Sequence, residues 1–246
     1  MKEMRVIGLE GIPEVAEGAD LAALLADACE RTGGLEDGDV VVVAQKVVSK
    51  AEGRVIHLSE VQASPRAEEL SADRDPRQTE VILGETARIV RSRPPLLIAE
   101  TKHGFVCASA GVDASNAPET DSVVLLPEDP DASADRLRAR LEELSGRSIG
   151  IVVTDSFGRA WRQGTTDVAI GCSGIRPLLD LRGRRDRVGY ELHATMIAVA
   201  DEIAGAAELV MGKTDGIPAA IVRGLDVAGP GRAADLVMPA ERDLFR

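Results

Sequence analysis

Two aspartates stand beside apolar runs of the sequence, where a divalent metal ion could be held. Asp155 follows the run Ile149–Val153 after Thr154, and Asp113 lies in the polar loop Gly111–Pro118, so we expect both acids in loops beside buried strands. One or two carboxylates plus substrate phosphates are the usual ligands of Mg²⁺, and Ser156 would add a hydroxyl. Taken alone, each aspartate is also explained by an Asx-turn or a helix cap. The sequence does not bring the two together in space.

Lys46 and Lys50 follow the apolar run Asp39–Ala44, which has the composition of a central strand buried on both faces. Ligands of open α/β sheets gather at the carboxyl ends of strands. If the chain becomes helical here, the two lysines share one face. They are therefore candidate phosphate-binding cations, with ordinary solvated lysines as the alternative.

The segment Gly212-Lys213-Thr214 resembles the end of a P-loop but does not fulfil its requirements. The first glycine of that motif would stand at position 207, where the chain has Ala207. A P-loop also opens a helix, which Pro218 would disrupt. A glycine turn that carries a lysine can still approach a phosphate, and an exposed turn without a ligand is the alternative.

Arg159, Trp161 and Arg162 form a second candidate cluster, and Trp161 is the only tryptophan. The tryptophan is either an anchor packed against the core or, beside two cations, part of a site for a planar ring or an anion. The second interpretation makes these residues candidate substrate contacts. The three histidines show no metal-ligand spacing.

These residues need a framework of strands and helices. We expect strands at Met4–Leu9, Asp39–Ala44, Leu96–Ala99, Phe105–Ala108, Ser122–Leu126, Ile149–Val153 and Ile217–Arg223, and a short one within Gly164–Gly174. We expect helices at Leu21–Arg31 with Asp20 as cap, at Ser64–Arg91 with a break at Asp75-Pro76, at Ala134–Leu144 with Ser133 as cap, and at Glu191–Ala206. The alternation predicts an α/β or mixed α+β fold.

The composition limits the domain organisation and the class of partner. The chain has 246 residues, of which 44% are hydrophobic and 2% aromatic, enough for one large domain or two interlocked smaller ones. The net charge of −12 argues against nucleic acids and anionic membrane surfaces. Three widely spaced cysteines predict free thiols in a reducing compartment. Without a signal peptide or a bilayer-length apolar run, we expect a soluble, cytoplasmic protein.

Six segments follow one another in an order that is specific. They read GIPEV, DVVVVAQKVVSKAEGR, AGVDASNAP, VVTDSFGRAWRQGTTDVAIG, ATMIAVADEIAGAAELVMGK and DGIPAAIVRG. Together they resemble the coenzyme F-420:L-glutamate ligases over nearly the whole chain. None of the longer segments is a general nucleotide motif.

The resemblance implies one gamma-glutamyl ligase domain over residues 1–246, with a family-specific mixed α/β fold in an intertwined homodimer. It implies GTP, Mg²⁺ or Mn²⁺, and K⁺. L-Glutamate would be joined to the lactyl carboxylate of the coenzyme F-420 precursor, and further glutamates would be γ-linked. An acyl phosphate would be the intermediate, with GDP and phosphate released. No covalent nucleophile of the protein is needed, and neither nucleic acid nor membrane is an expected partner.

The family's site residues carry over by position. The implied metal ligands are Asp113, Asp155 and Ser156, the last of which is often threonine in relatives. The implied nucleotide-binding residues are Ile12, Pro13, Glu14, Val15, Gln45, Lys46, Lys50, Asn116, Met211, Gly212, Lys213, Thr214, Asp215, Gly216, Ile217 and Pro218.

Two features depart from the family pattern. Archaeal members resemble MGQADEGIP in the late loop, whereas this chain has the shorter MGKTDGIP, with Lys213 at the place of a glutamine that can reach a metal. Lysine has no acceptor atom, so we expect Lys213 to contact the nucleotide. Some relatives also continue past a DLF segment into a flavin-binding reductase domain. We expect no such domain here, and either a stand-alone ligase or a piece of a longer fusion.

Two other functions are compatible with the same acids and lysines. One is a metal-dependent phosphotransferase or phosphohydrolase, and the other is a non-catalytic dimer that binds GTP or a flavin. Both rank below the ligase because neither accounts for so many ordered motifs.

Overall fold

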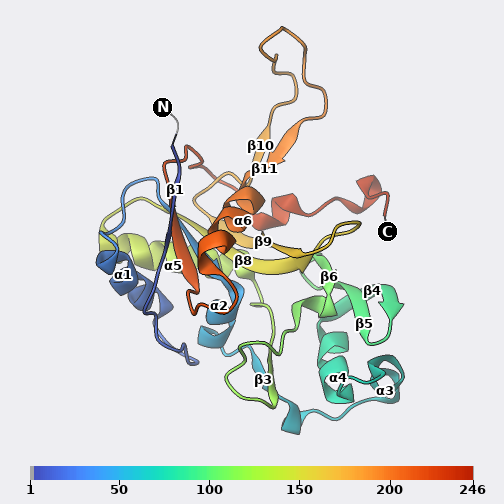
Figure 1. Cartoon of the computed structure of the whole chain (residues 1–246). Coiled ribbons are helices and arrows are strands. Elements are labelled where there is room, and N and C mark those ends of the chain that lie inside the picture. Colours follow the sequence, from blue (N-terminus) through green and yellow to red (C-terminus); the bar gives the residue numbers. More distant parts are fainter. Residues whose placement is uncertain (1–2, 246) are drawn as a thin grey trace.

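A five-stranded mixed sheet forms the centre of the computed structural model, which describes residues 3–245 (Figure 1). Its strand order is β1-β12-β2-β8-β9. The bounds are β1 (Arg5–Gly8), β12 (Ala219–Arg223), β2 (Val40–Ala44), β8 (Gly150–Gly158) and β9 (Thr165–Ser173). Only β2 and β8 run parallel, and the other neighbours are antiparallel. The expected mixture of helices and mixed sheets is confirmed.

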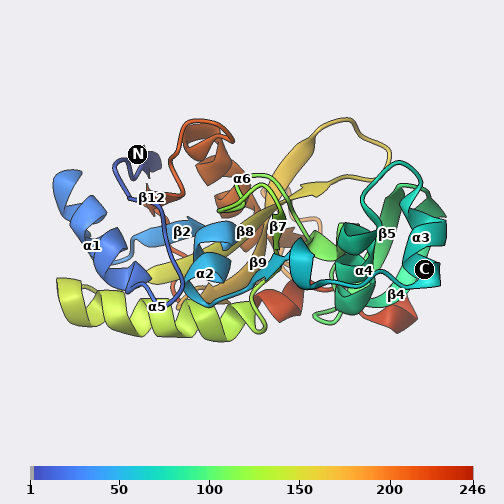
Figure 2. The same ribbon diagram turned by 90° about the horizontal axis from the view of Figure 1, so that it is seen from below.

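Helices cover both faces of this sheet. The helices α1 (Leu21–Arg31), α2 (Gln45–Ala51) and α5 (Pro130–Ser145) lie on one side, and α6 (Val199–Met211) lies on the other (Figure 2). Along β2, Val41 and Val43 pack into the first layer, whereas Val40 and Val42 pack into the second. The prediction that this strand is buried on both faces is confirmed. None of the helices within residues 3–245 is long and apolar enough to cross a lipid bilayer.

The remaining strands form three small sheets. The strands β4 (Thr86–Arg93), β5 (Leu96–Thr101) and β6 (Val106–Ala108) form one of them, beside α3 (Pro65–Ser71) and α4 (Pro76–Glu85). Another pairs β3 (Val55–His57) with β7 (Ser122–Val124), and the third pairs β10 (Leu178–Asp180) with β11 (Met196–Ala198). The segment between β10 and β11 projects from the body as a long arm (Figure 1).

Two of the expected helices are wrong at one end. The helical segment expected to reach Arg91 ends at Glu85, and β4 follows because it pairs with β5. The helix expected over Glu191–Ala206 is α6, which begins only at Val199. Residues 191–195 belong to the arm, and β11 precedes the helix. In both segments, pairing with a strand outweighs the local helical composition.

The third expected helix begins earlier than its sequence signal suggested. The cap of α5 is Asp129, whose carboxylate accepts a hydrogen bond from the Ala132 N–H at 2.9 Å, and Pro130 occupies the first turn. Ser133 therefore lies inside the helix, where its hydroxyl contacts Glu52 and the Asp129 carbonyl. The predicted cap of α1 is confirmed, because Asp20 accepts from Ala23.

The strands β8 and β9 extend beyond the rest of the sheet. The strand β2 ends at Ala44 opposite Thr154, whereas β8 and β9 continue together to Gly158 and Thr165. Asp155 was expected in a loop after the strand, which is wrong, because it lies within β8. The same holds for Ser156, and neither residue caps a helix.

The outer edge of β9 is covered by carboxylates of α6. The Ala169 N–H donates to Asp201 at 2.9 Å, and the Asp167 N–H donates to Glu208 at 3.0 Å. An uncovered edge strand presents unpaired N–H groups to other chains. Here helix α6 satisfies them and fixes the backbone of β9 at Asp167.

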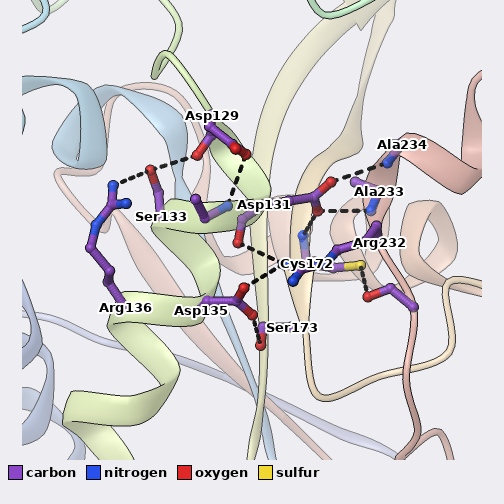
Figure 3. Close-up of polar contacts among 12 residues, drawn as sticks. Asp129, Asp131, Ser133, Asp135, Arg136, Cys172, Ser173, Arg232, Ala233 and Ala234 are labelled. Carbon is purple, nitrogen blue, oxygen red and sulfur yellow. Dashed lines mark hydrogen bonds and ion pairs between the residues drawn. The ribbon is translucent and has the colours of Figure 1, made fainter.

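Helix α5 continues this cover and anchors a late segment of the chain (Figure 3). The Asp131 carboxylate accepts from the N–H groups of Cys172 and Ala233, each at 2.8 Å. One turn further on, Asp135 forms an ion pair with Arg232. The segment around residue 232 is thereby fastened to both α5 and β9.

Candidate active site

Strand order brings four separate segments to one edge of the central sheet. Because β12 is antiparallel to both β1 and β2, its beginning lies beside their ends. The segment after β1, helix α2 after β2, and the loop before β12 therefore meet the middle of β8. A cavity of about 330 Å³ lies between them.

The cavity gathers most of the residues that the sequence indicated. Every predicted nucleotide-binding residue except Asp215 lines it, as do Asp155 and Ser156. The residues that were singled out but do not line it are Asp113, Asp215, Arg159, Trp161 and Arg162. The structure thus places the nucleotide candidates together and leaves the arginine–tryptophan cluster outside.

The predicted shared face of Lys46 and Lys50 is formed by helix α2. The Lys50 side chain is buried and pairs with the exposed carboxylate of Glu14, from the segment after β1. The Lys46 ammonium lies 2.7 Å from an oxygen of Asp113 and donates to the Ser115 hydroxyl. Both cations border the cavity, and both are held by carboxylates.

Asp113 combines a turn with an ion pair. Its carboxylate accepts from the Ser115 N–H at 2.7 Å, which is the Asx-turn weighed above. Burial opposes ionisation of this carboxyl, but the hydrogen bonds from Lys46 and Ser115 outweigh burial and lower its pKa. Asp113 is therefore ionised at neutral pH, one contact away from the cavity.

Asp155 is electrostatically different. Burial raises the pKa of the Asp155 carboxyl to about 7, although the Ser156 N–H favours ionisation. The charges of Asp167 and Asp113 raise this pKa further, and Lys46 opposes them. Asp155 forms no ion pair with any residue in the range 3–245. Its negative charge is poorly compensated by the protein itself.

These donors fit a divalent metal ion that is shared with a ligand. Within residues 3–245, no three His, Cys, Asp or Glu side chains form a metal site by themselves. Mg²⁺ usually retains waters and needs only one or two carboxylates plus substrate phosphates. The under-compensated Asp155 and the hydroxyl of Ser156 supply oxygen donors at the cavity wall.

Asp167 and Thr154 are site residues that sequence reasoning missed. Both line the cavity, and both are buried. The available signal was the carboxylate of Asp167 between Thr165-Thr166 and the apolar run Val168–Gly171, because aspartate is depleted in strands. An acid in such a strand needs a local reason.

The late loop confirms that no P-loop is present. Gly212 caps the carboxyl end of α6, and its N–H donates to Glu208. A P-loop would place this glycine at the beginning of a helix. The exposed side chain of Lys213 lines the cavity from this loop, so it can approach a ligand without a helix dipole behind it.

Trp161 is not an anchor in the core. Its side chain is 83% exposed at the tip of the β8–β9 ribbon. Among the aromatic rings of residues 3–245 it contacts that of Phe245, with ring centroids 5.1 Å apart, and its φ of 60° is unusual for a bulky residue. Strained, exposed aromatic residues of this kind are candidates for ligand contacts.

Comparison with known proteins points to one family. The family model described as F420-0:Gamma-glutamyl ligase matches residues 11–224. The chain is 47% identical to the Coenzyme F420:L-glutamate ligase of Methanopyrus kandleri, over 100% of both chains. It is 43% identical to the protein of that name from Methanothermobacter thermautotrophicus, over 98% of both chains. The Archaeoglobus fulgidus protein of that name is 44% identical over 99% of this chain and 96% of its own.

Proposed function

The chain belongs to the F420-0:gamma-glutamyl ligase family, and on that premise we propose that it ligates L-glutamate to a coenzyme F-420 precursor at the expense of GTP. The first glutamate joins the lactyl carboxylate, and later ones are γ-linked. The observation that carries the proposal is that the nucleotide candidates and Asp155 of β8 line one cavity.

Forming an amide from a carboxylate and an amine requires that the carboxylate first be activated. Attack of the precursor's carboxylate on the γ-phosphate of GTP gives an acyl phosphate and GDP. The amine of glutamate then displaces phosphate and forms the amide. Positioning and charge stabilisation are the main catalytic devices in phosphoryl transfer.

The residues of the cavity support these tasks. Lys46, Lys50 and Lys213 bring cations to the cavity wall from two sides. Asp113, Asp155 and Ser156 would hold Mg²⁺ or Mn²⁺, which would offset the charge of the phosphate oxygens when bound. K⁺ is included in the proposal through the family resemblance alone.

Ligation can be tested by mass. We combine the protein with GTP, Mn²⁺, L-glutamate and the precursor, and expect products heavier by one or more glutamyl units. A folded protein that adds none, beside a related ligase that does, would overturn the proposal. GTP breakdown without glutamate addition would favour a phosphohydrolase, and GTP binding without turnover would favour a binding module.

The tip of the β8–β9 ribbon is proposed to contact the precursor. Trp161 offers an exposed ring, and Arg159 and Arg162 offer cations. The strand β8, which leads to this tip, carries Asp155 and Ser156. A planar deazaflavin could stack on the tryptophan ring, and its phosphate tail could pair with the arginine cations.

Binding of the precursor is therefore expected to quench the fluorescence of Trp161, which is the only tryptophan in the chain. Substitution Arg162→Ala should weaken this binding by about 1–2 kcal/mol, because it removes a cation next to the phosphate. GTP alone should leave the fluorescence unchanged. Unaltered fluorescence at saturating precursor, with ligation intact, would exclude the tip as the contact.

An intertwined homodimer and a cytoplasmic location complete the proposal. The arm between β10 and β11 supports the homodimer, because it projects from the body (Figure 1) and carries the exposed side chains of Val188 and Tyr190. Sedimentation equilibrium should give twice the 26.0 kDa mass of the chain, and a monomer would contradict the dimer. The cytoplasmic location is supported by the three cysteines, which are buried and free.

A further inference from the structure

The side chains of Ser156 and Asp167 face each other across the β8–β9 ribbon, where the two residues are register partners. The Ser156 hydroxyl donates to one Asp167 oxygen at 2.6 Å. The Thr154 hydroxyl lies 3.1 Å from the other oxygen and 3.0 Å from the Val168 carbonyl oxygen, so the carboxylate shares the single Thr154 hydrogen with that carbonyl. The Ser156 hydrogen is thus directed at the Asp167 carboxylate, whereas the Thr154 hydrogen is shared between this carboxylate and a backbone carbonyl.

Asp167 lacks the partner that a buried acid usually has. Its side chain belongs to a residue that is 6% exposed, and no ion pair to it exists among residues 3–245. Buried carboxylates in proteins are normally paired with a cation or fully hydrogen-bonded. Two hydroxyl groups are a weak substitute for a cation, so a stabilising role alone explains this arrangement poorly.

The position of Asp167 is also fixed independently of these hydroxyls. Its own N–H is held by Glu208 of α6, and the neighbouring N–H of Ala169 is held by Asp201. The helix therefore locks the backbone that carries the carboxylate. Because Glu208 also accepts from the Gly212 N–H through its carbonyl, the same turn of α6 leads into the cavity loop.

The direction of the Ser156 hydrogen bond has a chemical consequence. A serine hydroxyl has one hydrogen and two lone pairs. With its hydrogen committed to Asp167, the Ser156 oxygen can face the cavity only as an acceptor. A carboxylate behind a ligand oxygen fixes its orientation and raises its basicity, as is usual behind metal ligands.

We propose that Asp167 is a positioning residue that fixes the Ser156 hydroxyl as an oxygen ligand for the divalent cation of this cavity. The inference rests on the proposed function in that it takes a cation to be used there. It predicts that Asp167 acts on the cation through Ser156.

The test measures Mn²⁺ binding without turnover. Free Mn²⁺ is followed by electron paramagnetic resonance, first with protein alone and then with a non-hydrolysable GTP analogue. We expect Asp167→Asn and Ser156→Ala each to weaken Mn²⁺ binding by about 10- to 100-fold. The double variant should bind no more weakly than either single one, because both changes remove the same interaction.

Two controls keep the result interpretable. Asp201→Asn alters the other carboxylate that holds β9, outside the cavity, and should leave Mn²⁺ affinity unchanged. Ser156→Thr keeps the hydroxyl and should keep the affinity. If Asp167→Asn does not fold, the contrast between Ser156→Ala and Ser156→Thr still tests the ligand, and equal affinities of these two would overturn the proposal.

Other outcomes also overturn it. Losses that add in the double variant would show that Asp167 acts independently of Ser156, and an unchanged affinity of Asp167→Asn would show that it does not act on the cation. Glutamate and precursor are absent throughout. A protein that fails to ligate glutamate can therefore still meet or fail this test.

Discussion

Asp155→Asn is expected to lower the rate of glutamate ligation by about 10³-fold and, at the same time, to stabilise the metal-free protein. The activity loss follows from removing a carboxylate that would hold the divalent cation, whose positive charge would stabilise the phosphoryl group. The gain in stability follows from burial, which raises the pKa of the Asp155 carboxyl to about 7. Asparagine keeps the shape but carries no charge to bury.

The pH dependence of this effect has a definite sign. The folded protein holds the Asp155 proton more tightly than the unfolded chain, whose aspartate pKa is about 3.9. The folded state therefore loses stability as pH rises from about 4 to about 7, and the full penalty remains above pH 7. At about 1.4 kcal/mol per pKa unit, it amounts to roughly 2–4 kcal/mol. The Asn variant should escape this loss.

Urea unfolding in EDTA at pH 5 and pH 8 measures the free energy of unfolding of both proteins and so this pH-dependent loss of stability. The variant should exceed the parent protein in free energy of unfolding at pH 8, and by less at pH 5. Asp113→Asn is the matched comparison. It should also lose ligation, but without a gain in stability, because the pKa of Asp113 is lowered rather than raised.

The exposed Asp73, which lies between α3 and α4, provides a neutral control. Asp73→Asn should change neither ligation nor unfolding by more than about 0.5 kcal/mol. Full activity of Asp155→Asn would remove this residue from the metal site. Equal stability of parent and variant at both pH values would instead show that the carboxylate is well compensated.

Arg223→Met is expected to destabilise the fold by about 3–5 kcal/mol, because it leaves a buried carboxylate without its cation. Asp39 is 1% exposed, and the Arg223 guanidinium contacts both of its oxygens at 2.8 Å. The same guanidinium donates to the Gly34 carbonyl and pairs with Glu36. It thereby joins the end of β12 to the turn that precedes β2.

Denaturant unfolding gives the size of this effect. Arg66→Met is the matched control, since the ion pair of Arg66 with Glu69 is exposed on both sides and should contribute less than about 1 kcal/mol. Adding Asp39→Asn to Arg223→Met should recover part of the loss, because no buried charge is then left unpaired. A loss below about 1 kcal/mol in Arg223→Met would show that water reaches Asp39.

Local chemistry explains the elements that the sequence predicted well. A capping aspartate and apolar residues at helical spacing determine α1 from Leu21 to Arg31. The run of valines in β2 leaves no polar face, so burial by helices on both sides follows from composition alone. Missing glycine and following proline were enough to exclude a P-loop at Gly212.

Pairing between distant strands explains the elements that it predicted poorly. Thr86–Arg93 is a strand because it pairs with β5. Met196–Ala198 is a strand because it pairs with β10. In both places the chain is locally compatible with a helix. The partner that decides the matter lies elsewhere in the sequence, and no local pattern reports it.

The sequence by itself determined which residues were chemically suited to hold phosphate and a metal: the lysines after β2, the acids at positions 113 and 155, and the glycine turn at 212. Only the tertiary structure decided that most of them border one cavity, because this depends on β12 running antiparallel between β1 and β2. It also added Asp167, whose relation to Ser156 exists only through the register of β8 and β9. Residue type is a local property, whereas register and strand order arise from contacts between segments far apart in the chain.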